Sequence, residues 1–541
     1  MRARFTRRTG SLAAAAVLAA VGASPVIVDR LDAAPKPAAQ VAAAGLPEQL
    51  DALMADPRYA GGKAGLVVRN ASTGAVVYSR NGNQRFTPAS NEKLLTSAAA
   101  VEVLGLDYRF RTTVSAAGNR AGTQLTGNLY LKGTGDPTIQ AAGFDALAAQ
   151  VAAAGIKSVR GAVVADDSWF DSARIGSEWA ATDEQFSYAA QISALTVAAT
   201  NDLDTGIVQL AVRPAAAAGD PASVALTPAT TYVKIVNNVT TGAAGSGEVL
   251  SVDRVHGQNT IVLTGSLPAG GATQTRLRTV EEPSLYAASM LRAALMKRGV
   301  TVSSTSTPRG VTPAGATQVA SRDSITLREL LPLFLKLSNN GHAEILTKAM
   351  GRKVSNAGTW PAGLAAATTF LRNSGVDTAN LRMSDGAGLS RLDLVTPDQV
   401  TVLLRAVQSK PWFATWYAAL PIAGNPDRIA GGTLTNRMRG TAAAENLRGK
   451  TGSMTSVSAL SGYVTAADGQ KLVFSLLSND WLASSVKPLE DSIAVTLANS
   501  GGATATLKRD LARLPAQRQP KNDPSTLVDE RTLECSWVKA C

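Results

Sequence analysis

The sequence predicts an α/β (α+β) domain that is noncontiguous, because a large β-rich region is inserted into it. The 541 residues are 45% hydrophobic, which is enough to bury a large core. Apolar residues recur with helical spacing over 94–104 and again after 283, whereas 111–282 contains short Val-, Thr- and Leu-rich runs between Gly, Pro and Asn. Short polar strings typical of an active site lie on both sides of this β-rich region.

The N-terminus has the architecture of a secretory signal peptide, which we assign to residues 1–23. Four arginines lie within the first eight residues, an Ala/Leu/Val-rich run follows, and small residues come after it. If the segment is not cleaved, residues 12–28 approach the short limit for a membrane span. Arg7-Arg8 also suggests a twin-arginine signal, so the export route stays open. Either way the protein is predicted to be exported, to the extracellular/cell-wall or periplasmic side of a bacterial membrane.

Charge and cysteine content agree with export. Removing the four signal arginines lowers the formal net charge from +12 to +8, which favours anionic surroundings such as cell-wall polymers. Nucleic acid is excluded as a partner in an exported chain, whereas peripheral membrane or cell-wall association stays open. The two cysteines, Cys535 and Cys541, are predicted to form a small disulfide loop in a polar tail over 516–541, with idle thiols as the alternative.

The first part of the noncontiguous domain is predicted over 47–110, after an Ala/Pro-rich linker over 24–46. Alternating residues over 65–69 and 75–79 predict a β-hairpin with a Gly-containing loop. The helical pattern that follows begins close to Ser90.

The insertion over 111–282 is predicted to be mostly β and to form two subdomains, with one Ala-rich helix near 143–153. The second part of the domain is predicted over 283–515. Its patterns predict helices and two adjacent strands at the following positions: helices 283–298, 324–337, 342–351, 361–373, 397–407 and 483–499, and strands 455–464 and 471–478.

Three polar strings carry the candidate chemistry: Ser90-Asn91-Glu92-Lys93, Ser338-Asn339-Asn340 and Lys450-Thr451-Gly452. A serine hydroxyl needs a base to become a nucleophile, and Lys93 lies one helical turn after Ser90. A lysine can act as that base only when it is neutral, and burial together with a second cation favours the neutral amine. Lys450 is the candidate second cation.

The other residues of these strings match the remaining steps of acyl transfer. Ser338 can pass a proton to the leaving amine, and Asn340 can hold a substrate amide. Lys450 and Thr451 can bind a terminal carboxylate. The backbone N–H groups of Ser90 and Ser453 are the candidates for an oxyanion hole.

The order of the strings makes them more specific than each string alone. Ser484 and Lys487 also satisfy Ser-x-x-Lys, but they follow Lys-Thr-Gly, which occurs once. With only His256 and His342, a Ser-His-Asp triad has few options and a zinc site is improbable. His342 is interpreted as a residue at a helix start. We therefore expect neither a metal nor a cofactor.

The ordered strings resemble those of penicillin-binding proteins and class A β-lactamases. The chain is similar in particular to the D-Ala-D-Ala carboxypeptidase/endopeptidase family of class C low-molecular-mass penicillin-binding proteins, a likeness that covers about 47–505. Further matching strings are Gly133-Thr134-Gly135-Asp136-Pro137, Ser384-Asp385-Gly386-Ala387-Gly388-Leu389-Ser390-Arg391, Leu420-Pro421-Ile422-Ala423-Gly424 and Gly432-Thr433-Leu434. Ala387 departs from the family pattern, which has Ser at this position.

The resemblance implies a transpeptidase/β-lactamase-like fold, a peptidoglycan stem peptide as substrate and β-lactam antibiotics as covalent inhibitors. It also implies substrate-binding residues beyond the three strings. An acidic residue with an arginine suits a zwitterionic amino acid centre such as diaminopimelate. These further residues are Asp183, Tyr188, Leu389 and Arg391, with Trp179 as a weaker candidate. Thr451, Gly452 and Ser453 are the substrate-binding candidates at the third string, and Met454 beside them is a candidate apolar contact or a core residue.

The function predicted from the sequence is a serine-type D-Ala-D-Ala carboxypeptidase or D,D-endopeptidase that works through an acyl-enzyme on Ser90. A β-lactamase or esterase on the same scaffold is the first alternative, and a noncatalytic wall-binding protein is the second. The balance between carboxypeptidase and endopeptidase, the diamino acid of the stem and the oligomeric state stay open.

Overall fold

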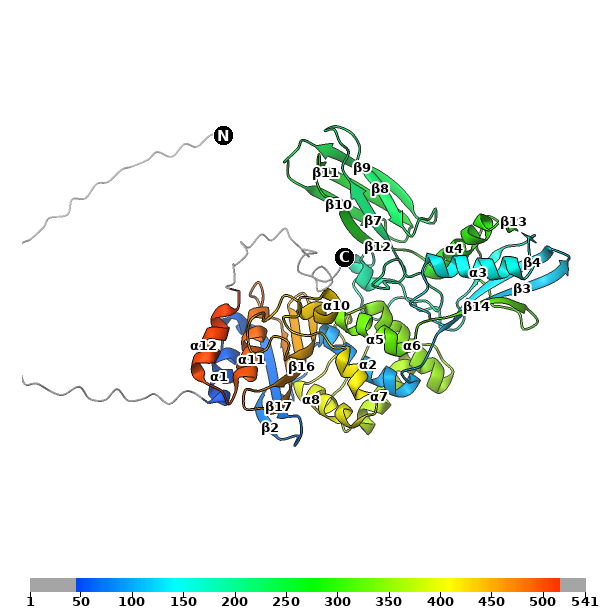
Figure 1. Ribbon diagram of the computed structural model, residues 1–541. Coiled ribbons are helices and arrows are strands. Elements are labelled where there is room, and N and C mark those ends of the chain that lie inside the picture. The colour runs from blue at the N-terminus through cyan, green and yellow to red at the C-terminus, as the bar shows by residue number, and fades with distance from the viewer. Residues whose placement is uncertain (1–44, 516–541) are drawn as a thin grey trace, which may run out of the picture. The chain divides into compact units, whose positions relative to one another are not determined.

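The computed structural model describes residues 45–515. The predicted signal peptide, nearly all of the predicted linker and the tail with Cys535 and Cys541 lie outside the described residues. The mixed α/β fold class is confirmed, since helices and strands alternate along the described chain (Figure 1). Within residues 45–515, no helix is both long and apolar enough to cross a membrane.

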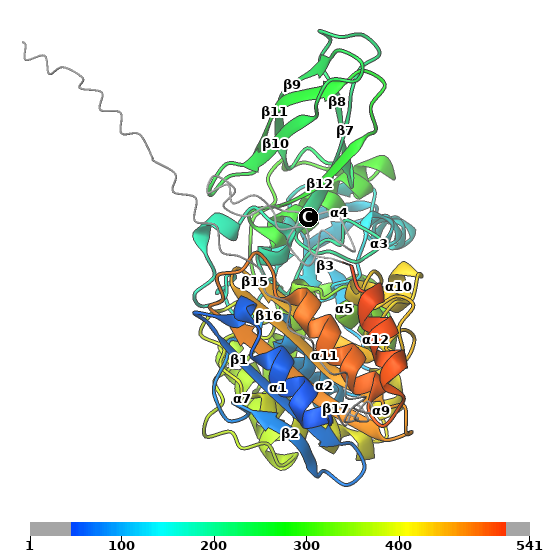
Figure 2. The same cartoon turned by 90° about the vertical axis from the view of Figure 1, so that its left-hand side faces the viewer.

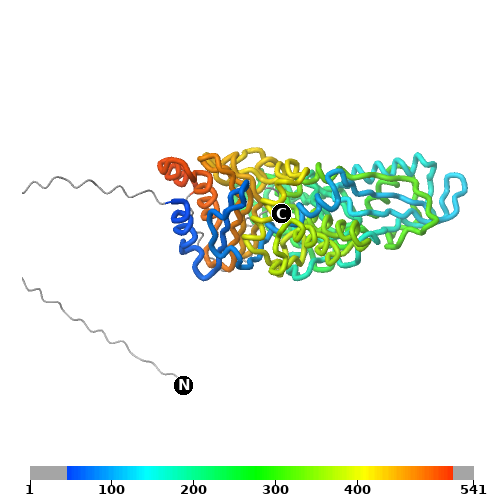
Figure 3. The backbone as a smooth tube through the Cα atoms, turned by 90° about the horizontal axis from the view of Figure 1, so that it is seen from below, coloured from blue at the N-terminus to red at the C-terminus, as the bar shows by residue number. Residues whose placement is uncertain are grey.

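A five-stranded antiparallel sheet forms the centre of the part that carries the three polar strings. Its strand order is β15-β16-β17-β1-β2, so the strand nearest the N-terminus pairs with a strand close to the C-terminal end of the described chain (Figure 3). This pairing joins sequence segments on either side of the β-rich region. The strands are β1 (Lys63–Asn70), β2 (Val76–Arg80), β15 (Arg448–Met454), β16 (Val457–Thr465) and β17 (Lys471–Asn479).

Helices cover both faces of this sheet. Neighbouring strand residues point to opposite faces: Ala459 of β16 packs in the core beneath α2 and α8, and Leu460 packs in the core beneath α1 and α11. Figure 2 shows α1, α11 and α12 on the near face, with α2 behind the sheet. The bounds are α1 (Leu46–Met54), α2 (Glu92–Leu104), α8 (Pro397–Ala406), α11 (Lys487–Asn499) and α12 (Thr504–Arg513).

The remaining helices of this part lie between α4 and β15 in sequence. Thr326 caps α5 by accepting from the backbone N–H of Glu329, whose carboxylate accepts in return from the backbone N–H of Thr326. This capping box explains why the predicted helix begins slightly later than residue 324. The bounds are α5 (Leu327–Lys336), α6 (Asn340–Ser355), α7 (Trp360–Asn373), α9 (Phe413–Ala418) and α10 (Arg428–Gly431).

The β-rich region is built around a six-stranded sheet, in which β3 and β4 form the long central hairpin. Helices α3 and α4 pack beside it (Figure 1), and their apolar residues share a core with the sheet. The elements are β3 (Arg111–Ala121), β4 (Gln124–Gly133), α3 (Ala141–Ala153), β5 (Ser158–Val159), β6 (Val163–Asp166), α4 (Pro283–Lys297), β13 (Thr301–Val302) and β14 (Thr317–Asp323).

Two three-stranded sheets follow β6 in the sequence, one in the order β12-β7-β8 and one in the order β10-β11-β9. Strands β9 and β11 are parallel, and the other pairs in the two sheets are antiparallel. The bounds are β7 (Ile207–Arg213), β8 (Ser223–Thr227), β9 (Lys234–Gly242), β10 (Val249–Arg254), β11 (Thr260–Pro268) and β12 (Gln274–Thr279).

The six-stranded sheet extends beyond residue 282, where we predicted the insertion to end. β14 pairs with β3, and α4 shares its apolar core with α3. The helical pattern of α4 suggested a return to the first domain, but periodicity cannot tell which core a helix packs against. We therefore propose that the inserted region ends near residue 323.

Candidate active site

Ser90 lies where the chain turns into α2. Ala89 has a positive φ of 46°, and Ser90 sits in the short 3-10 turn that leads into the helix. Lys93 is one turn further on, and its Nζ donates to Ser90 Oγ at 2.8 Å and to the carbonyl oxygen of Ala387 at 2.7 Å. Lys93 is fully buried. The first turn of α2 thus holds an amine directly against the hydroxyl.

Ser338 faces this pair from the break between α5 and α6. Its φ of 57° is left-handed, which interrupts the helical path and turns its side chain toward the pocket. Lys450 on β15 donates to Ser338 Oγ at 2.8 Å and to the carbonyl oxygen of Thr451 at 2.9 Å. The predicted second cation is therefore in contact with the predicted proton relay.

Strand β15 lies very close to the turn that carries Ser90. Asn91 Nδ2 donates to the carbonyl oxygen of Lys450 at 3.0 Å. A Cβ at Gly452 would lie 2.7 Å from the carbonyl oxygen of Pro88 and 3.1 Å from the backbone nitrogen of Ser90. Glycine at this position is needed for the approach. β15 is an edge strand of its sheet, so one side of its backbone has no strand partner.

Two further strings of the sequence support the wall formed by Ser338 and β15. Lys336, at the end of α5, donates to the carbonyl oxygens of Leu420 at 2.9 Å and Ala430 at 2.8 Å. Gly432 has a positive φ, and a Cβ there would lie 2.3 Å from the carbonyl oxygen of Lys336. Thr451 Oγ1 donates to Thr433 Oγ1 at 2.7 Å. These strings therefore position α5 and β15 rather than contact the pocket.

The loop that supplies the Ala387 carbonyl is organised by the carboxylate of Asp385. Trp179 Nε1 donates to this carboxylate at 2.9 Å, and a run of backbone N–H groups donates to it as well. Ala387 donates its backbone N–H to both Asp385 and Glu344. The backbone donors to Asp385 are Ala387 (3.0 Å), Gly388 (2.6 Å), Leu389 (3.1 Å) and Ser390 (2.7 Å).

Ala387 stands where the family pattern has a serine, and its backbone is nevertheless fully engaged. Its carbonyl accepts from Lys93, and its N–H donates to Glu344 Oε1 at 2.8 Å. Its side chain is buried. The local hydrogen bonds that matter for Lys93 are therefore made by the backbone and do not need a hydroxyl at this position.

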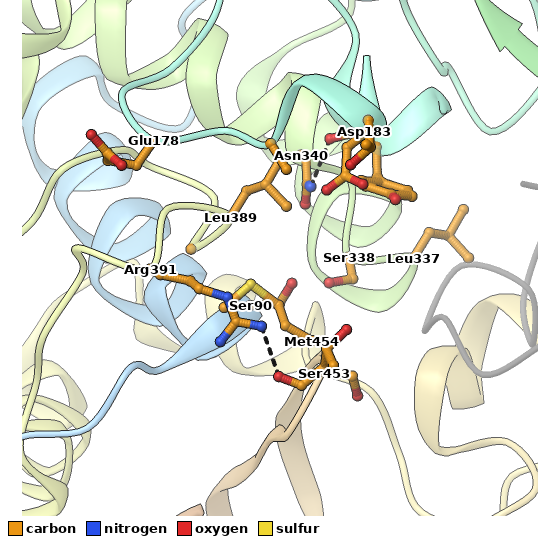
Figure 4. Close-up of a pocket in the computed structure, with 15 residues that line it drawn as sticks. Ser90, Glu178, Asp183, Leu337, Ser338, Asn340, Leu389, Arg391, Ser453 and Met454 are labelled. Atoms are coloured by element: carbon orange, nitrogen blue, oxygen red, sulfur yellow. Dashed lines mark hydrogen bonds between the residues drawn. The ribbon is translucent and has the colours of Figure 1, made fainter. Parts of the chain in front are cut away.

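A pocket of about 300 Å³ opens in front of Ser90 (Figure 4). It is lined by residues of the segment between β6 and β7, of the α5–α6 break, of the loop over 388–391 and of β15. Ser338, Asn340, Leu389, Arg391, Ser453 and Met454 point toward the space above Ser90. The full lining is Ser90, Glu178, Ala180, Thr182, Asp183, Tyr188, Leu337, Ser338, Asn340, Gly388, Leu389, Arg391, Ser453, Met454 and Thr455.

The predicted recognition residues Asp183, Tyr188, Leu389, Arg391 and Met454 all line this pocket. Arg391 Nη2 donates to the carbonyl oxygen of Thr455 at 2.7 Å, and Asn340 Nδ2 donates to that of Tyr188 at 2.8 Å. Burial raises the pKa of Asp183, while hydrogen bonds from Tyr188 and Thr182 and the charge of Arg391 act in the opposite direction.

Some predicted residues lie behind the pocket surface instead of on it. Lys93, Lys450, Thr451 and Gly452 do not line the pocket, and the first two act on Ser90 and Ser338 from beneath. Trp179, the weaker candidate, is also not among the lining residues. Its indole is engaged with Asp385 and packs edge-on against Trp360, which makes it a support for the loop.

The two histidines do not line the pocket. His342 is buried in the first turn of α6, where its backbone N–H donates to Asn339 Oδ1 at 3.1 Å. Its Nε2 lies 2.8 Å from the carbonyl oxygen of Leu203. His256 is exposed and lies against Glu184. Among residues 45–515, no group of His, Cys, Asp and Glu side chains is arranged to hold a metal ion.

Several pocket residues were not predicted. Leu337 and Thr455 directly adjoin predicted residues, so adjacency was a usable signal. Thr182 directly precedes the predicted Asp183, whereas Glu178 lies in an irregular segment whose residues carry no periodicity. Glu178 has a φ of 63°, a left-handed conformation that directs this loop across the pocket rim.

Comparison with known proteins gives a consistent result. A family model described as the D-Ala-D-Ala carboxypeptidase 3 (S13) family matches residues 46–500. A D-alanyl-D-alanine carboxypeptidase from Actinomadura sp. is 46% identical over 544 residues, which cover 99% of this chain and 98% of the relative.

Solved structures show the same fold. The crystal structure of penicillin binding protein 4 (dacB) from Haemophilus influenzae has a TM-score of 0.69 at 24% identity, covering 81% of this chain and 94% of that one. The same protein complexed with a novel β-lactam has a TM-score of 0.64 at 23% identity, with the same coverage of 81% and 94%.

Proposed function

The chain belongs to the D-Ala-D-Ala carboxypeptidase 3 (S13) family, and on this premise we propose that Ser90 is the nucleophile with which it cleaves D-Ala-D-Ala peptides. Family membership makes it a serine-type hydrolase of this specificity. The single observation that carries the residue assignment is the 2.8 Å contact between Lys93 Nζ and Ser90 Oγ, opposite the matching contact between Lys450 and Ser338.

Acylation begins at the carbonyl carbon of the penultimate D-Ala. Ser90 Oγ attacks this carbon, and its proton passes to the neutral amine of Lys93. The carbonyl oxygen of Ala387, which accepts from Lys93 at 2.7 Å, keeps the amine aimed at Ser90. The backbone N–H groups of Ser90 and Ser453 are the proposed oxyanion donors, since β15 brings these two backbones together.

Ser338 and Lys450 then serve the leaving group. Ser338 gives a proton to the nitrogen of the terminal D-Ala as the C–N bond breaks, and the ammonium of Lys450 reprotonates Ser338 Oγ. In deacylation a proton of the attacking water passes through Ser338 back to Lys450, and Lys93 returns its proton to Ser90 Oγ. Water hydrolyses the resulting ester on Ser90 and releases the shortened peptide. Lys450 provides from behind the pocket surface the positive charge that favours the terminal carboxylate, the Thr451 hydroxyl is held by Thr433, and Asn340 holds the substrate amide.

The stem side chain is assigned to the part of the pocket between Asp183 and Arg391, which both line it. The carboxylate of Asp183 suits an ammonium group, and the guanidinium of Arg391 suits a carboxylate. Leu389, Met454 and Tyr188 supply apolar and aromatic contacts beside them. The pairing fits an amino acid centre at the end of a diamino acid side chain.

Peptidoglycan is the proposed source of the substrate, and we propose that the chain acts outside the cytoplasmic membrane. The arginine-rich, then apolar, N-terminal segment supports export. β-Lactams are the proposed covalent inhibitors, because the Haemophilus influenzae relative of the same fold binds a β-lactam. The acyl-enzyme with Ser90 would then deacylate slowly.

The test is a time course of intact-protein mass after addition of benzylpenicillin, followed by peptide mapping and by hydrolysis assays with a D-Ala-D-Ala peptide. We expect a persistent adduct on Ser90 and release of D-Ala. Ser90→Ala is expected to abolish both. Ser484→Ala is the matched control, since Ser484 belongs to the other Ser-x-x-Lys string and is exposed.

Two results would contradict the proposal. Peptide hydrolysis by Ser90→Ala at the rate of the unaltered chain would exclude Ser90 as the nucleophile. A short-lived adduct with hydrolysed drug accumulating would instead favour a β-lactamase.

A further inference from the structure

Glu92 is an acidic residue placed between the nucleophile and its base. It follows Ser90 by two positions, precedes Lys93 and begins α2. Its side chain is fully buried, and neither carboxyl oxygen has a hydrogen-bond partner. The stem of Glu92 packs against Gly388, where an added Cβ would lie 2.9 Å from the Cβ of Glu92. The carboxyl of Glu92 is therefore buried beneath the loop that contains Ala387 and Gly388.

Three more buried carboxyls face Glu92 from two neighbouring elements: Asp385 and Asp393 on the loop, and Glu344 on α6. Asp385 accepts from four backbone N–H groups and Trp179. Glu344 accepts from Gly386, Ala387 and Trp360. Asp393 Oδ1 accepts from the backbone N–H of Ser384, and its Oδ2 has no hydrogen-bond partner.

The cations around this group are engaged elsewhere. Lys93 Nζ contacts Ser90 and Ala387. Lys348 on α6 donates to Asp171 Oδ1 at 2.6 Å and to the carbonyl oxygen of Ala173, and its Nζ lies 3.8 Å from the centre of the Trp360 ring. Lys450 on β15 contacts Ser338. Within residues 45–515, none of these lysines hydrogen-bonds to Glu92, whose carboxyl oxygens have no partner.

A buried carboxylate without hydrogen bonds is very costly, so a carboxyl in this position keeps its proton. The surroundings act in the same direction: burial, then the charges of Asp385 and Glu344, raise the pKa of Glu92, and only Lys93 lowers it. Asp385 and Glu344 differ from Glu92 in their contacts, because backbone N–H groups donate to both of them.

We propose that Glu92 is a positioning residue for acylation, whose protonated, neutral form leaves Lys93 as the uncharged amine that accepts the proton of Ser90. This inference rests on the proposed function. Of these two groups, the carboxyl of Glu92 holds the proton, and the amine of Lys93 is therefore free to act as the base. The alternative distribution, an ionised Glu92 beside an ammonium, would remove the base.

The proposal gives Glu92 an effect at high pH. When Glu92 loses its proton, the buried anion stabilises the ammonium of Lys93 and opposes the negative charge that develops on the substrate carbonyl oxygen. Both effects slow acylation. The charges of Asp385 and Glu344 act on Glu92 in the direction that opposes loss of its proton, and a charged Glu92 in turn raises the pKa of Asp393.

The first experiment measures the rate of acylation by benzylpenicillin against pH, using intact-protein mass, for the unaltered chain, Glu92→Gln and Glu92→Met. Neither replacement can ionise, and Met suits a site where the acid makes no hydrogen bond. We expect the unaltered chain to lose rate on the alkaline side, and both variants to keep theirs to a pH higher by about one unit or more. Unfolding curves in urea check that the variants are folded.

The second experiment needs no variant to fold. Infrared spectra of the unaltered chain at increasing pH are expected to contain a band from a protonated carboxyl group that disappears in step with the alkaline loss of acylation. In folded Glu92→Gln the spectrum is expected to lose this component, whereas components from Glu344 and Asp393, whose pKa values burial also raises, remain. Lack of such a band, or a band that disappears at an unrelated pH, overturns the proposal.

Other results separate this inference from the proposed function. If acylation forms an adduct on Ser90 and the three profiles superimpose, the role of Glu92 is wrong and the nucleophile stands. If Glu92→Gln moves the acidic side of the acylation–pH profile to lower pH, Glu92 is ionised and stabilises the ammonium of Lys93. That result also overturns the proposal. If the unaltered chain forms no adduct, the proposed function itself fails.

Discussion

Ser90, Lys93, Ser338 and Lys450 form two hydrogen-bonded pairs on facing walls of the pocket. The first pair was predictable from the sequence, because residues three apart on a helix lie on the same face. The second pair joins a break between helices to an edge strand, and no local spacing encodes that contact. Its prediction depended on the resemblance to known families.

Asp183 provides a test of substrate recognition. Asp183→Asn removes the charge proposed to bind the stem ammonium, so KM for a peptide with a free amino acid centre on its side chain should rise about 10- to 100-fold. The acylating atoms are untouched, so kcat should change much less. Steady-state kinetics with matched peptides, one with and one without that centre, measure the effect. An equal loss for both peptides would contradict the assignment.

The pH dependence of KM gives the same residue a second test. Because burial raises the pKa of Asp183, the ionised form that binds an ammonium is reached only at a higher pH than for an exposed aspartate. KM for the charged peptide should therefore fall as pH rises through that raised pKa. Asp183→Asn should make KM nearly independent of pH over this range. A pH dependence retained in the variant would assign the effect to another group.

Single residues outside the polar strings were the hardest to predict. Glu178 and Thr182 reach the pocket from an irregular loop, whose path depends on contacts with the rest of the fold. Trp179 lies between them in sequence and turns the other way, toward Asp385. Proximity in sequence to pocket residues therefore does not place an aromatic side chain in the pocket.

The approach of β15 to the turn at Ser90 depends on the absence of a side chain at Gly452. Gly452→Ala would place a methyl group 2.7 Å from the carbonyl oxygen of Pro88 and force the strand away from Ser90. Because the proposed oxyanion donors come from these two backbones, we expect acylation by benzylpenicillin to slow by about 100-fold or more. The rate is measured from the intact-protein mass of acylation reactions quenched at successive times.

Gly315→Ala is the matched control, since a Cβ at Gly315 meets no atom within 4 Å. Its acylation rate should equal that of the unaltered chain. A Gly452→Ala variant that acylates at the normal rate, while remaining folded, would mean that the distance between β15 and Ser90 does not set the oxyanion site.

Helices were predicted well where a cap coincided with the apolar period. Thr326 and Thr396 each form a capping box, and the helices α5 and α8 start at the next residue. The two-residue strands β5 and β13 could not be predicted, because they exist only through pairing with β4 and with each other. Local propensity carries no information about such pairings.

The arrangement of the described chain depends on contacts between distant segments. The pairing of β1 with β17 follows from the prediction that the domain is noncontiguous, since the first and last parts must then meet. The extension of the six-stranded sheet to β14 does not follow from composition, because α4 has the same helical pattern as the helices of the other part. Hydrophobic patterns predict that a helix is buried, but not against which partner.

The burial of Glu92 also affects how the free energy of unfolding depends on pH. Its pKa is raised in the folded protein, whereas an unfolded glutamate titrates near about 4.3. Above that pH the folded state holds one more proton than the unfolded state, so this residue lowers the free energy of unfolding as pH rises toward its raised pKa. The slope contributed is up to about 1.4 kcal/mol per pH unit.

Glu92→Gln cannot titrate and should therefore reduce the fall in stability with pH by up to that slope. Urea unfolding at a series of pH values from about 5 upward measures the difference between variant and unaltered chain, which cancels the other groups. Glu248→Gln, at an exposed glutamate, serves as the control and should leave the pH dependence unchanged. A constant difference between Glu92→Gln and the unaltered chain at every pH would show that Glu92 has the same charge state folded and unfolded. The neutral acid beside Lys93 would then be excluded by a measurement that does not involve catalysis.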